Sequence, residues 1–592
     1  MSITEANRGL NENGRTFAAA PDMKPKSRLP LVRWAGRFVA ISLGLIQIVL
    51  ARNTVGPDAR SYLEIARAIL RHDWAMTINA YWSALYPWLL AADLAIFKPS
   101  LREEFPVAHA LAFPLLLACI AAFEFFWSSL LRREEEASES REQGVQPIPP
   151  VQMWILGYSF FIWSTVGGIV TAINPDLCMT TMALLAAGLL VRITNGTEEK
   201  RSLYVWFGIC LGVGYLTKAI LFPMGVVFLI VMALASWRVL RVRAGNFLIP
   251  LVIFAMIASP EIALLSRSKG RFTFSDTGKL AFAWYTYDLP LRNWQGQPAW
   301  SGKPLHPTRK IKEHPAVYEF NGPLRSSYPP WYDPSYWNDG LAPKFQWGVV
   351  IRHVLGEILK LGEILTKPAA WALGILAILA GCDLRKTIRA IAAHWYLILI
   401  SAAAFAAHCL TLVESRYLVP WEILLWGAVL AGVRLRRNTA RWYGLVTAIV
   451  AAGLLTSMVR LERGEAVHGF HNDASAECVT AEGLQQMDLT PGTPVGAIGF
   501  DNDAYWAYLL RLNIVAEINT DETCFFWGEP AEAQAQILDK FAQAGASVVV
   551  ANTGDGIRST STPVPIPFDI CAHPGAGWRR IPGSRDYAFF LK

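Results

Sequence analysis

Charged residues are scarce in this chain: Asp, Glu, Lys and Arg make up 17% of its 592 residues, against about 25% in soluble proteins. The chain also lacks a phosphate-cradling glycine-rich loop, a serine elbow and an HExxH motif, and no Cys/His cluster has metal-ligand spacing. These motifs normally serve nucleotide chemistry, serine hydrolysis and zinc proteolysis. Their absence argues against a cytosolic reaction driven by nucleotides.

Hydrophobic residues are abundant instead, at 53% of the chain, and the mean hydropathy is +0.30. They cluster in long runs with few charges, and a membrane span needs about 20 such residues. Because backbone groups in lipid must be satisfied within helices, we predict an α-helical polytopic membrane protein. About eleven spans are expected, near Trp34–Ala51, Phe105–Leu131, Val151–Ile173, Asp176–Ile193, Tyr204–Leu221, Pro223–Leu240, Phe247–Leu265, Ala369–Cys382, Trp395–Leu412, Tyr417–Val433 and Trp442–Met458.

Lys and Arg gather in alternate segments between these spans. Because short cytoplasmic loops are enriched in Lys and Arg, this set is predicted to be cytoplasmic, together with the N-terminus, in an inner-membrane protein. Residues 1–30 are polar and lack a secretory signal, so they are expected to form a disordered cytoplasmic tail. The net charge of +7 needs no nucleic-acid partner, because loop bias and lipid headgroups account for it. The cationic segments carry Lys24, Lys26, Arg28 and Arg33; Arg132 and Arg133; Arg192, Lys200 and Arg201; Arg238, Arg241 and Arg243; Arg385, Lys386 and Arg389; and Arg434, Arg436, Arg437 and Arg441.

Three segments on the opposite, outward side are too long to be simple connections. Residues 53–104 have helical periodicity and predict two interfacial amphipathic helices, one from Asp58 to Ile69 and one from Tyr86 to Phe97. Residues 266–368 end in a further amphipathic helix, Val349–Leu365, and are rich in aromatics that either anchor at the interface or line a sugar cleft. These aromatics include Trp284, Tyr285, Tyr287, Trp294, Trp300, Trp331, Tyr332 and Trp337.

Residues 461–592 are expected to form a small extracytoplasmic α/β domain after the membrane domain of residues 31–460. Val495–Phe500 and Ala546–Ala551 are typical of buried strands, and Ala531–Ala544 of the helix between them. Cys478, Cys524 and Cys571 lie here, where oxidising surroundings permit one disulfide. The sequence does not choose the pair.

Two outward carboxylates are candidates for chemistry. Asp58, in Val55-Gly-Pro-Asp58, follows the first span, where it can act as a general base towards an acceptor hydroxyl or as a helix N-cap, and the two roles are compatible. Asp176, in Asn174-Pro-Asp176, is either a second site carboxylate or the cap of the fourth span, and capping is favoured.

Two outward cations need an explanation, because this side of the membrane disfavours Lys and Arg. Lys218 ends the fifth span and Arg416 precedes the tenth. Either each side chain snorkels to the headgroups, or both bind the phosphate of a lipid ligand, Arg as a fork and Lys as a point charge. Glu414 is close enough in sequence to pair with Arg416.

The order and sidedness of several short motifs resemble the membrane glycosyltransferases of the GT-C fold that use polyprenyl-phosphate sugars. The similarity covers about residues 31–458, and the nearest branch contains the protein mannosyltransferases, aminoarabinose transferases and galacturonosyltransferases. The motifs are Gly56-Pro-Asp58 with Tyr62, Ser83-Ala-Leu-Tyr-Pro-Trp-Leu-Leu90, Asn174-Pro-Asp-Leu177, Gly214-Tyr-Leu-Thr-Lys218 and Arg416-Tyr-Leu-Val-Pro420.

The resemblance implies that Asp58 is the catalytic base and that Arg416 and Lys218 stabilise the leaving phosphate, with Asp176, Tyr62 and Tyr417 contacting substrate. The implied donor is a sugar on an undecaprenyl-type phosphate, and the implied acceptor is a lipid, glycan or protein. Protein mannosyltransferases carry an Asp-Glu pair where this chain has Asp58-Ala59, which argues against a strict protein O-mannosyltransferase. Some members of the broader fold use a divalent cation, and this possibility stays open.

Two other classes of protein compete with an enzyme. A transporter or flippase would move a lipid-linked sugar without breaking a bond, but the paired inverted repeats frequent in transporters are not evident. A sensor or scaffold would use residues 461–592 to bind envelope components. Only the enzyme gives Asp58, Lys218 and Arg416 a common purpose, so their convergence on one site is the discriminating observation.

Overall fold

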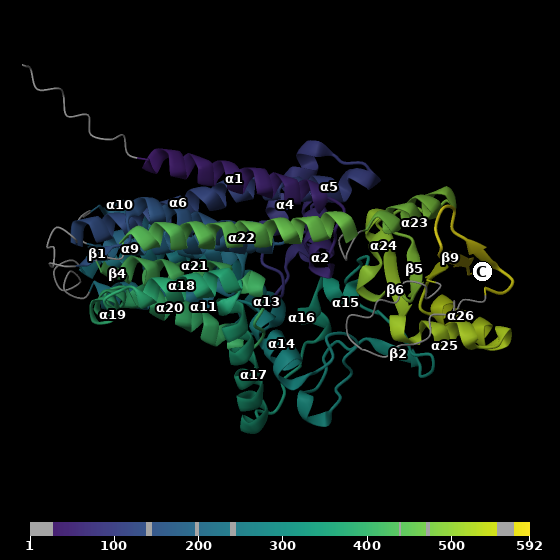
Figure 1. The fold of residues 1–592 in the computed structure, drawn as a ribbon. Coiled ribbons are helices and arrows are strands. Elements are labelled where there is room, and N and C mark those ends of the chain that lie inside the picture. The colour runs from purple at the N-terminus through teal and green to yellow at the C-terminus, as the bar shows by residue number, and fades with distance from the viewer. Residues whose placement is uncertain are drawn as a thin grey trace, which may run out of the picture.

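The computed structural model describes residues 28–137, 145–195, 200–236, 244–436, 440–468, 474–552 and 574–591. Long helices run side by side in a bundle, and a separate α/β unit is attached at one end (Figure 1). The expected cytoplasmic tail up to residue 27, and Cys571, lie outside the described residues.

Each segment expected to span the membrane is helical over most of its described residues, and the chain is an α-helical membrane protein. Within the described ranges, five helices are long and apolar enough to cross a bilayer, or up to seven if each of two bent pairs counts as one span. This number is lower than eleven because several bundle helices are short or interrupted. The bundle helices are α1 (Leu29–Leu50), α6 (Ala112–Ala137), α7 (Pro150–Phe161), α9 (Asp176–Asn195), α10 (Arg201–Thr217), α11 (Leu221–Ala235), α13 (Ala244–Lys269), α18 (Ala369–Ala380), α20 (Trp395–Cys409), α21 (Ser415–Gly432) and α22 (Ala440–His468).

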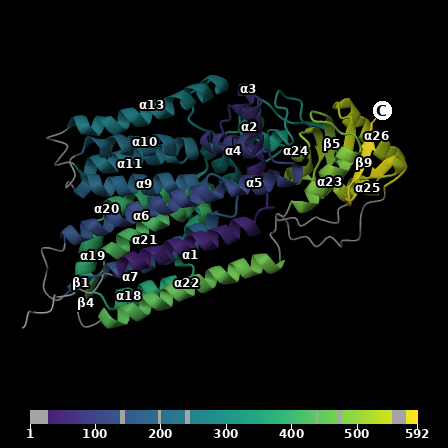
Figure 2. The ribbon, with the colours of Figure 1, turned by 90° about the horizontal axis from the view of Figure 1, so that it is seen from above.

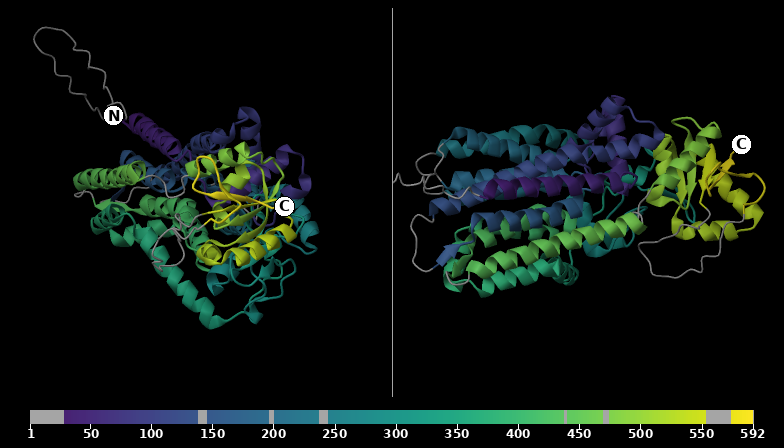
Figure 3. Two further views of the ribbon diagram at one scale, coloured as in Figure 1. Left: turned by 90° about the vertical axis from the view of Figure 1, so that its right-hand side faces the viewer. Right: turned by 45° about the horizontal axis from the view of Figure 1, so that its top comes forward.

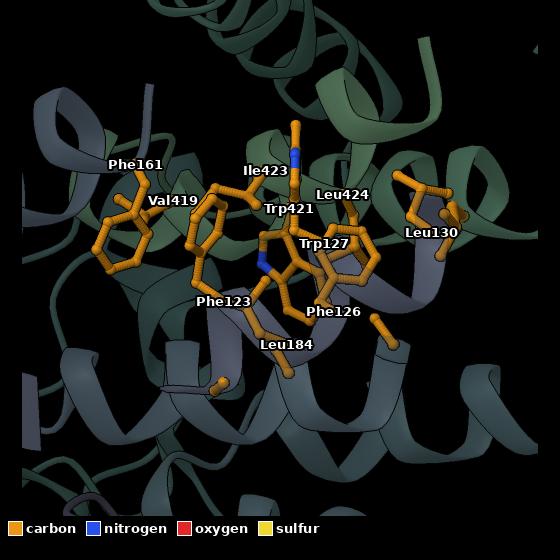
Figure 4. Close-up of a cluster of buried hydrophobic side chains, with 14 of the residues drawn as sticks. Phe123, Phe126, Trp127, Leu130, Phe161, Leu184, Val419, Trp421, Ile423 and Leu424 are labelled. Carbon is orange, nitrogen blue, oxygen red and sulfur yellow. The ribbon is translucent and has the colours of Figure 1, made fainter. Parts of the chain in front are cut away.

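The centre of the bundle is an aromatic core between α6, α7, α9 and α21 (Figure 4). Phe123 and Phe126 of α6 and Trp421 of α21 are almost fully buried. Helices approach closely where glycine replaces a larger residue: a Cβ on Gly427 of α21 would lie 3.3 Å from Phe126. This packing fixes the positions of α9 and α21, whose first turns carry Asp176 and Arg416.

Two helices lie steeply across the bundle direction. The amphipathic helix α17 (Trp347–Thr366), confirmed near its expected bounds, bends by 77° into α18, with apolar Ile351, Leu355 and Leu359 exposed. At the other end of the bundle, α19 (Leu384–Ala392) bends by 74° into α20. It lies beside the ribbon of β1 (Val145–Pro147) and β4 (Arg434–Arg436) (Figure 2), so the cationic segments of α19 and β4 are at the end opposite the α/β unit.

A layer of short helices separates the bundle from the α/β unit (Figure 3). The two predicted helices of residues 53–104 are present as α2 (Pro57–Leu70) and α4 (Leu85–Phe97). The interfacial interpretation is wrong for α2, because nine of its 14 residues are buried by protein. The other short helices of the layer are α3 (Trp74–Thr77), α5 (Glu104–Ala110), α14 (Thr277–Ala281), α15 (Pro329–Tyr332) and α16 (Pro334–Trp337), whereas α8 (Gly167–Ile169) packs within the bundle.

The α/β unit is built on a seven-stranded sheet of order β2-β3-β6-β5-β7-β9-β8. The predicted strands are confirmed as β5 (Pro494–Ile498) and β7 (Val548–Ala551), which pair in parallel, and the predicted helix as α26 (Ala531–Gln543). Cys524 forms a disulfide. The remaining helices and strands are α23 (Ser475–Gln486), α24 (Tyr505–Leu509), α25 (Thr523–Gly528), β6 (Asn513–Ile518), β8 (Trp578–Arg580) and β9 (Tyr587–Phe590).

Two strands of this sheet come from the aromatic segment of residues 266–368 rather than from the C-terminal part of the chain. These are β2 (Arg309–Lys312) and β3 (Val317–Glu319), and β3 pairs antiparallel with β6. Val317 is fully buried in the same cluster as Ile498 and Ile518. The aromatic segment and the C-terminal residues therefore share one hydrophobic core.

Replacing Val317 by Ala tests this shared core. Loss of buried apolar contacts should lower the free energy of unfolding of the α/β unit by about 1–3 kcal/mol, measured by urea titration of the purified chain with tryptophan fluorescence. The control is Lys312→Ala, at a half-buried position of the edge strand β2, and it should change little. Equal stability of both variants would contradict a shared core.

Candidate active site

The predicted outward charges meet where the bundle ends against α2. Asp58 lies in the first turn of α2, Arg416 in the first turn of α21, and Lys218 directly after α10. Arg416 Nη2 is 3.5 Å from Asp58 Oδ2, and Lys218 forms an ion pair with Asp176. Four elements distant in sequence thus bring two carboxylates and two cations into one charge cluster.

Tyr417 connects the two cations of this cluster. Lys218 Nζ lies 4.0 Å from the centroid of its ring, and the Arg416 guanidinium carbon lies 4.7 Å from it. Arg416 Nη2 also donates a hydrogen bond of 2.9 Å to the Tyr417 hydroxyl, and the His408 ring stacks with the tyrosine at 5.7 Å between centroids. An aromatic face attracts cations, so Tyr417 holds both close together despite their mutual repulsion.

Asp58 does not cap its helix. Gly56 is the N-cap of α2, with no side-chain capping hydrogen bond. Asp58 Oδ1 instead accepts a hydrogen bond of 3.3 Å from Trp331 Nε1, and the side chain is 31% exposed. The carboxylate is therefore held from two sides and still has an open face.

Asp176 also differs from the favoured interpretation as a cap. Asn174 Oδ1 accepts the 3.0 Å hydrogen bond from the Asp176 backbone N–H, so Asn174 satisfies this donor at the start of α9. The Asp176 side chain is fully buried and points to Lys218. Burial of a carboxylate requires a compensating charge, and Lys218 supplies it.

Snorkelling explains neither cation. The side chains of Lys218 and Arg416 are only 23% and 26% exposed, and both are directed to carboxylates inside the protein. The suggested pair with Glu414 is confirmed: Glu414 Oε1 lies 2.9 Å from Arg416 Nε. Arg416 is therefore placed between Glu414 and Asp58.

Tyrosine and tryptophan side chains surround the carboxylate. Tyr62 packs edge-on against Trp82 and Tyr86, at 5.0 and 5.3 Å between centroids. Burial raises the pKa of Tyr62 well above its usual value, and the charges of Asp58 and Asp176 raise it further. Tyr62 is therefore a neutral phenol that supports the site.

The sequence did not single out three aromatic residues near Asp58. Trp331 donates a hydrogen bond to its carboxylate. Burial raises the pKa values of Tyr81 and Tyr285. The charge of Asp58 raises these pKa values further and that of Arg416 lowers them, which shows that both tyrosines are close to the ion pair. Trp331 and Tyr285 were two among many aromatics of one segment. Their spacing gave no signal, because their roles depend on how the segment folds over α2.

A small pocket that is partly open to solvent adjoins the charge cluster. Tyr81 forms part of its wall, and Leu216 and Ala219 flank the turn that carries Lys218. Glu261 of α13 also lines the pocket. In the described part of the chain, no group of three or more His, Cys, Asp or Glu side chains is arranged to hold a metal ion.

Similarity to known proteins is found at the level of three-dimensional structure. No protein-family profile matches the chain, and no curated protein matches it significantly. Among solved structures, it is similar to ArnT from Cupriavidus metallidurans bound to undecaprenyl phosphate, with a TM-score of 0.51, 14% identity, and coverage of 89% of this chain and 93% of ArnT. The apo form of ArnT gives a TM-score of 0.47 at 15% identity, covering 88% and 93% of the two chains.

A third similar structure is the Archaeoglobus fulgidus oligosaccharyltransferase in complex with Zn and sulfate, with a TM-score of 0.46 and 14% identity, covering 88% of this chain and 68% of that one. The likeness to undecaprenyl-phosphate-bound ArnT shows the fold. The chain has the GT-C membrane fold, as its motifs suggested.

A double-mutant cycle tests the buried pair of Lys218 and Asp176. Asp176→Asn leaves the lysine charge without its partner and should lower the free energy of unfolding by about 3 kcal/mol, measured by thermal unfolding in detergent. Adding Lys218→Met removes the stranded charge and should recover at least half of the loss. Additive losses in the double variant would contradict a direct pair.

Proposed function

We propose that the protein is an inverting glycosyltransferase that transfers a sugar from a polyprenyl-phosphate donor to an envelope acceptor on the outward face of the inner membrane. The supporting observation is the convergence of Asp58, Arg416 and Lys218 at the end of the bundle. A transporter has no need of a general base beside phosphate-binding cations, and a scaffold gives these charges no shared task.

Asp58 is the proposed general base. Its open face accepts the proton of an acceptor hydroxyl while that oxygen attacks the anomeric carbon of the sugar. The new carbon–oxygen bond forms as the bond to the phosphate oxygen breaks, and the electron pair leaves with the lipid phosphate. A single displacement from the opposite face inverts the configuration. Trp331, which donates to Asp58 Oδ1, holds the carboxylate in one orientation.

Arg416 and Lys218 are the proposed phosphate ligands. Charge develops on the phosphate as it leaves, and fixed cations in a site shielded from water stabilise such charge strongly. Tyr417 holds both cations before substrate arrives, so little reorganisation is needed. Because Arg416 contacts Asp58 and is itself a proposed phosphate ligand, it also sets the distance between the acceptor hydroxyl and the leaving group.

The proposed orientation follows from the ends of the bundle. Cationic α19 and β4 lie opposite the α/β unit (Figure 2), and cytoplasmic loops are enriched in Lys and Arg. The N-terminus would then be cytoplasmic, and the site and the α/β unit extracytoplasmic. A lipid donor would enter from the membrane with its phosphate at the level of the charge cluster.

Asp58→Asn tests the proposed base. Loss of proton transfer should lower the transfer rate by about 10²–10⁴-fold, measured as release of undecaprenyl phosphate from extracted undecaprenyl-phosphate sugars incubated with envelope acceptors. Asp73→Asn, at an exposed carboxylate of the same outward segment, is the control and should retain the wild-type rate. A folded Asp58→Asn variant with near-normal turnover would remove Asp58 from this role.

Arg416→Gln tests the phosphate site without requiring turnover. Losing a charged hydrogen-bond donor should weaken binding of undecaprenyl phosphate by about 10–100-fold, measured by fluorescence titration of the purified protein. Arg352→Gln removes an exposed arginine of α17 and should leave the Kd unchanged. Equal affinities in the two variants would exclude Arg416 as a phosphate ligand.

A further inference from the structure

We propose that the α/β unit is a working part of the transferase site: through Arg60 and Arg67 it holds α2, and with it Asp58, at a fixed distance from the cations of the bundle. Arg60 and Arg67 are thus positioning residues that do not touch substrate. This inference rests on the proposed function, because it assigns a role in the same transfer reaction to the outer domain.

Arg60 lies two residues after Asp58, about 3 Å further along the helix axis, and is only 1% exposed. Its guanidinium carbon lies 4.8 Å from the Tyr328 ring centroid and 5.7 Å from that of Tyr505 in α24. In the described part of the chain, neither terminal nitrogen of Arg60 has a hydrogen-bond partner. The tyrosine faces therefore hold this buried cation, since a planar guanidinium stacks well on aromatic rings.

Two carboxylates add to the clamp that Arg60, Tyr328 and Tyr505 form. Burial raises the pKa of Glu64, one turn after Arg60, and the charge of Arg60 lowers it again. Burial and Arg60 have the same opposing effects on the pKa of Asp503. Arg60 thus stabilises negative charge both on its own helix and on the α/β unit, which draws the two together.

Arg67 makes a second connection at the other end of α2. It binds Glu104 with two hydrogen bonds, the one from Nε being 2.9 Å long. The same carboxylate accepts a hydrogen bond of 2.5 Å from the hydroxyl of Tyr508 in α24. The Arg67 and Glu104 side chains are 16% and 7% exposed. The pair is therefore shielded from solvent, where ion pairs gain strength.

The segment that carries Trp331 closes the connection to Asp58. Ser61 of α2 donates a 2.7 Å hydrogen bond to the backbone carbonyl of Trp331. The indole N–H of the same tryptophan donates to Asp58. The backbone N–H of Ser327 donates to Glu64 at 2.6 Å. α2 is thus attached to this segment at both the backbone and the side chains.

The same segment is anchored to the α/β sheet. The backbone N–H of Ile514 in β6 donates to the Ser326 carbonyl at 3.3 Å, and the Tyr328 hydroxyl donates to Glu517 of β6 at 3.0 Å. A continuous set of contacts therefore runs from the sheet through residues 326–331 to Asp58. Apart from the contact of Arg416 with Asp58, the bundle cations have partners outside α2: Tyr417 contacts both, Asp176 pairs with Lys218, and Glu414 pairs with Arg416.

This separation gives the inference a distinctive signature. Loosening α2 moves the base but leaves the phosphate ligands in place, and a misplacement of about 1 Å can cost on the order of 10²-fold in rate. Variants of the clamp should therefore lose kcat while keeping both the KM for the lipid donor and the affinity for undecaprenyl phosphate. Simple unfolding would lower all of these together.

The test compares Arg60→Met and Tyr508→Phe with wild type. Hydrogen exchange of residues 57–70 should become at least tenfold faster in Arg60→Met, with a smaller increase in Tyr508→Phe. The kcat for release of undecaprenyl phosphate should fall at least tenfold and about threefold, respectively. The Kd for undecaprenyl phosphate should stay within twofold of wild type. If Arg60→Met does not fold, Tyr508→Phe, which removes one hydroxyl, decides the outcome.

Arg102→Gln is the matched control. It breaks an exposed ion pair with Glu482, which also joins the first outward segment to the α/β unit but lies outside α2. Its exchange, kcat and Kd should equal those of wild type. Unchanged exchange or kcat in the clamp variants, or a Kd that weakens in step with kcat, would overturn the inference. A wild-type protein without transfer activity would instead refute the proposed function, while the exchange arm would still report whether the clamp exists.

Discussion

The contact between Asp58 and Arg416 joins the two parts of this molecule, and the arrangement of the site depends on it. Asp58 belongs to the layer of short helices outside the bundle, whereas Arg416 starts a bundle helix. Their 3.5 Å separation requires that the layer of short helices has one defined register against the end of the bundle. Opposite charges at this distance attract strongly when water is limited, so the contact also stabilises the register that it requires.

The charges around this contact are arranged to compensate one another. Asp176 is fully buried, and its negative charge would destabilise the fold without Lys218. Tyr417 attracts Lys218 and Arg416 to the same ring. The result is a balanced charge cluster in which two cations are held close together before any ligand binds. Arg416 is held in place by the bundle core, in which Trp421 and Phe126 fix α21 against α6 (Figure 4).

The outer α/β unit is not an independent appendage. Its sheet incorporates β2 and β3 from the aromatic segment, and that segment places Trp331 against Asp58. The domain boundary that the sequence suggests near residue 460 is therefore not a boundary of the folded structure. The sheet, the aromatic segment and α2 form a single packed layer over the bundle end, and through this layer the outer unit reaches the carboxylate.

Sequence alone was enough to predict the fold class, the helical segments and the small group of charged residues worth considering. Hydropathy and the Lys and Arg distribution are local properties, and they suffice for these conclusions. The strands β5 and β7 could also be predicted, because buried strands have a local apolar pattern. The same patterns overcounted the helices that are long enough to span a bilayer, since bends such as those before α18 and α20 have no clear local signature.

How those residues are used depends on contacts that form only in the folded chain. Local sequence allowed Asp58 and Asp176 to be caps. In the structure, Gly56 is the N-cap of α2, Asn174 accepts the backbone N–H of Asp176, and both carboxylates face cations from other helices. Trp331, Arg60 and Tyr508 were not identifiable, and strands β2 and β3 were missed. Their roles arise from contacts between segments up to several hundred residues apart, and the energies of such contacts depend on distance in space, which no local pattern encodes.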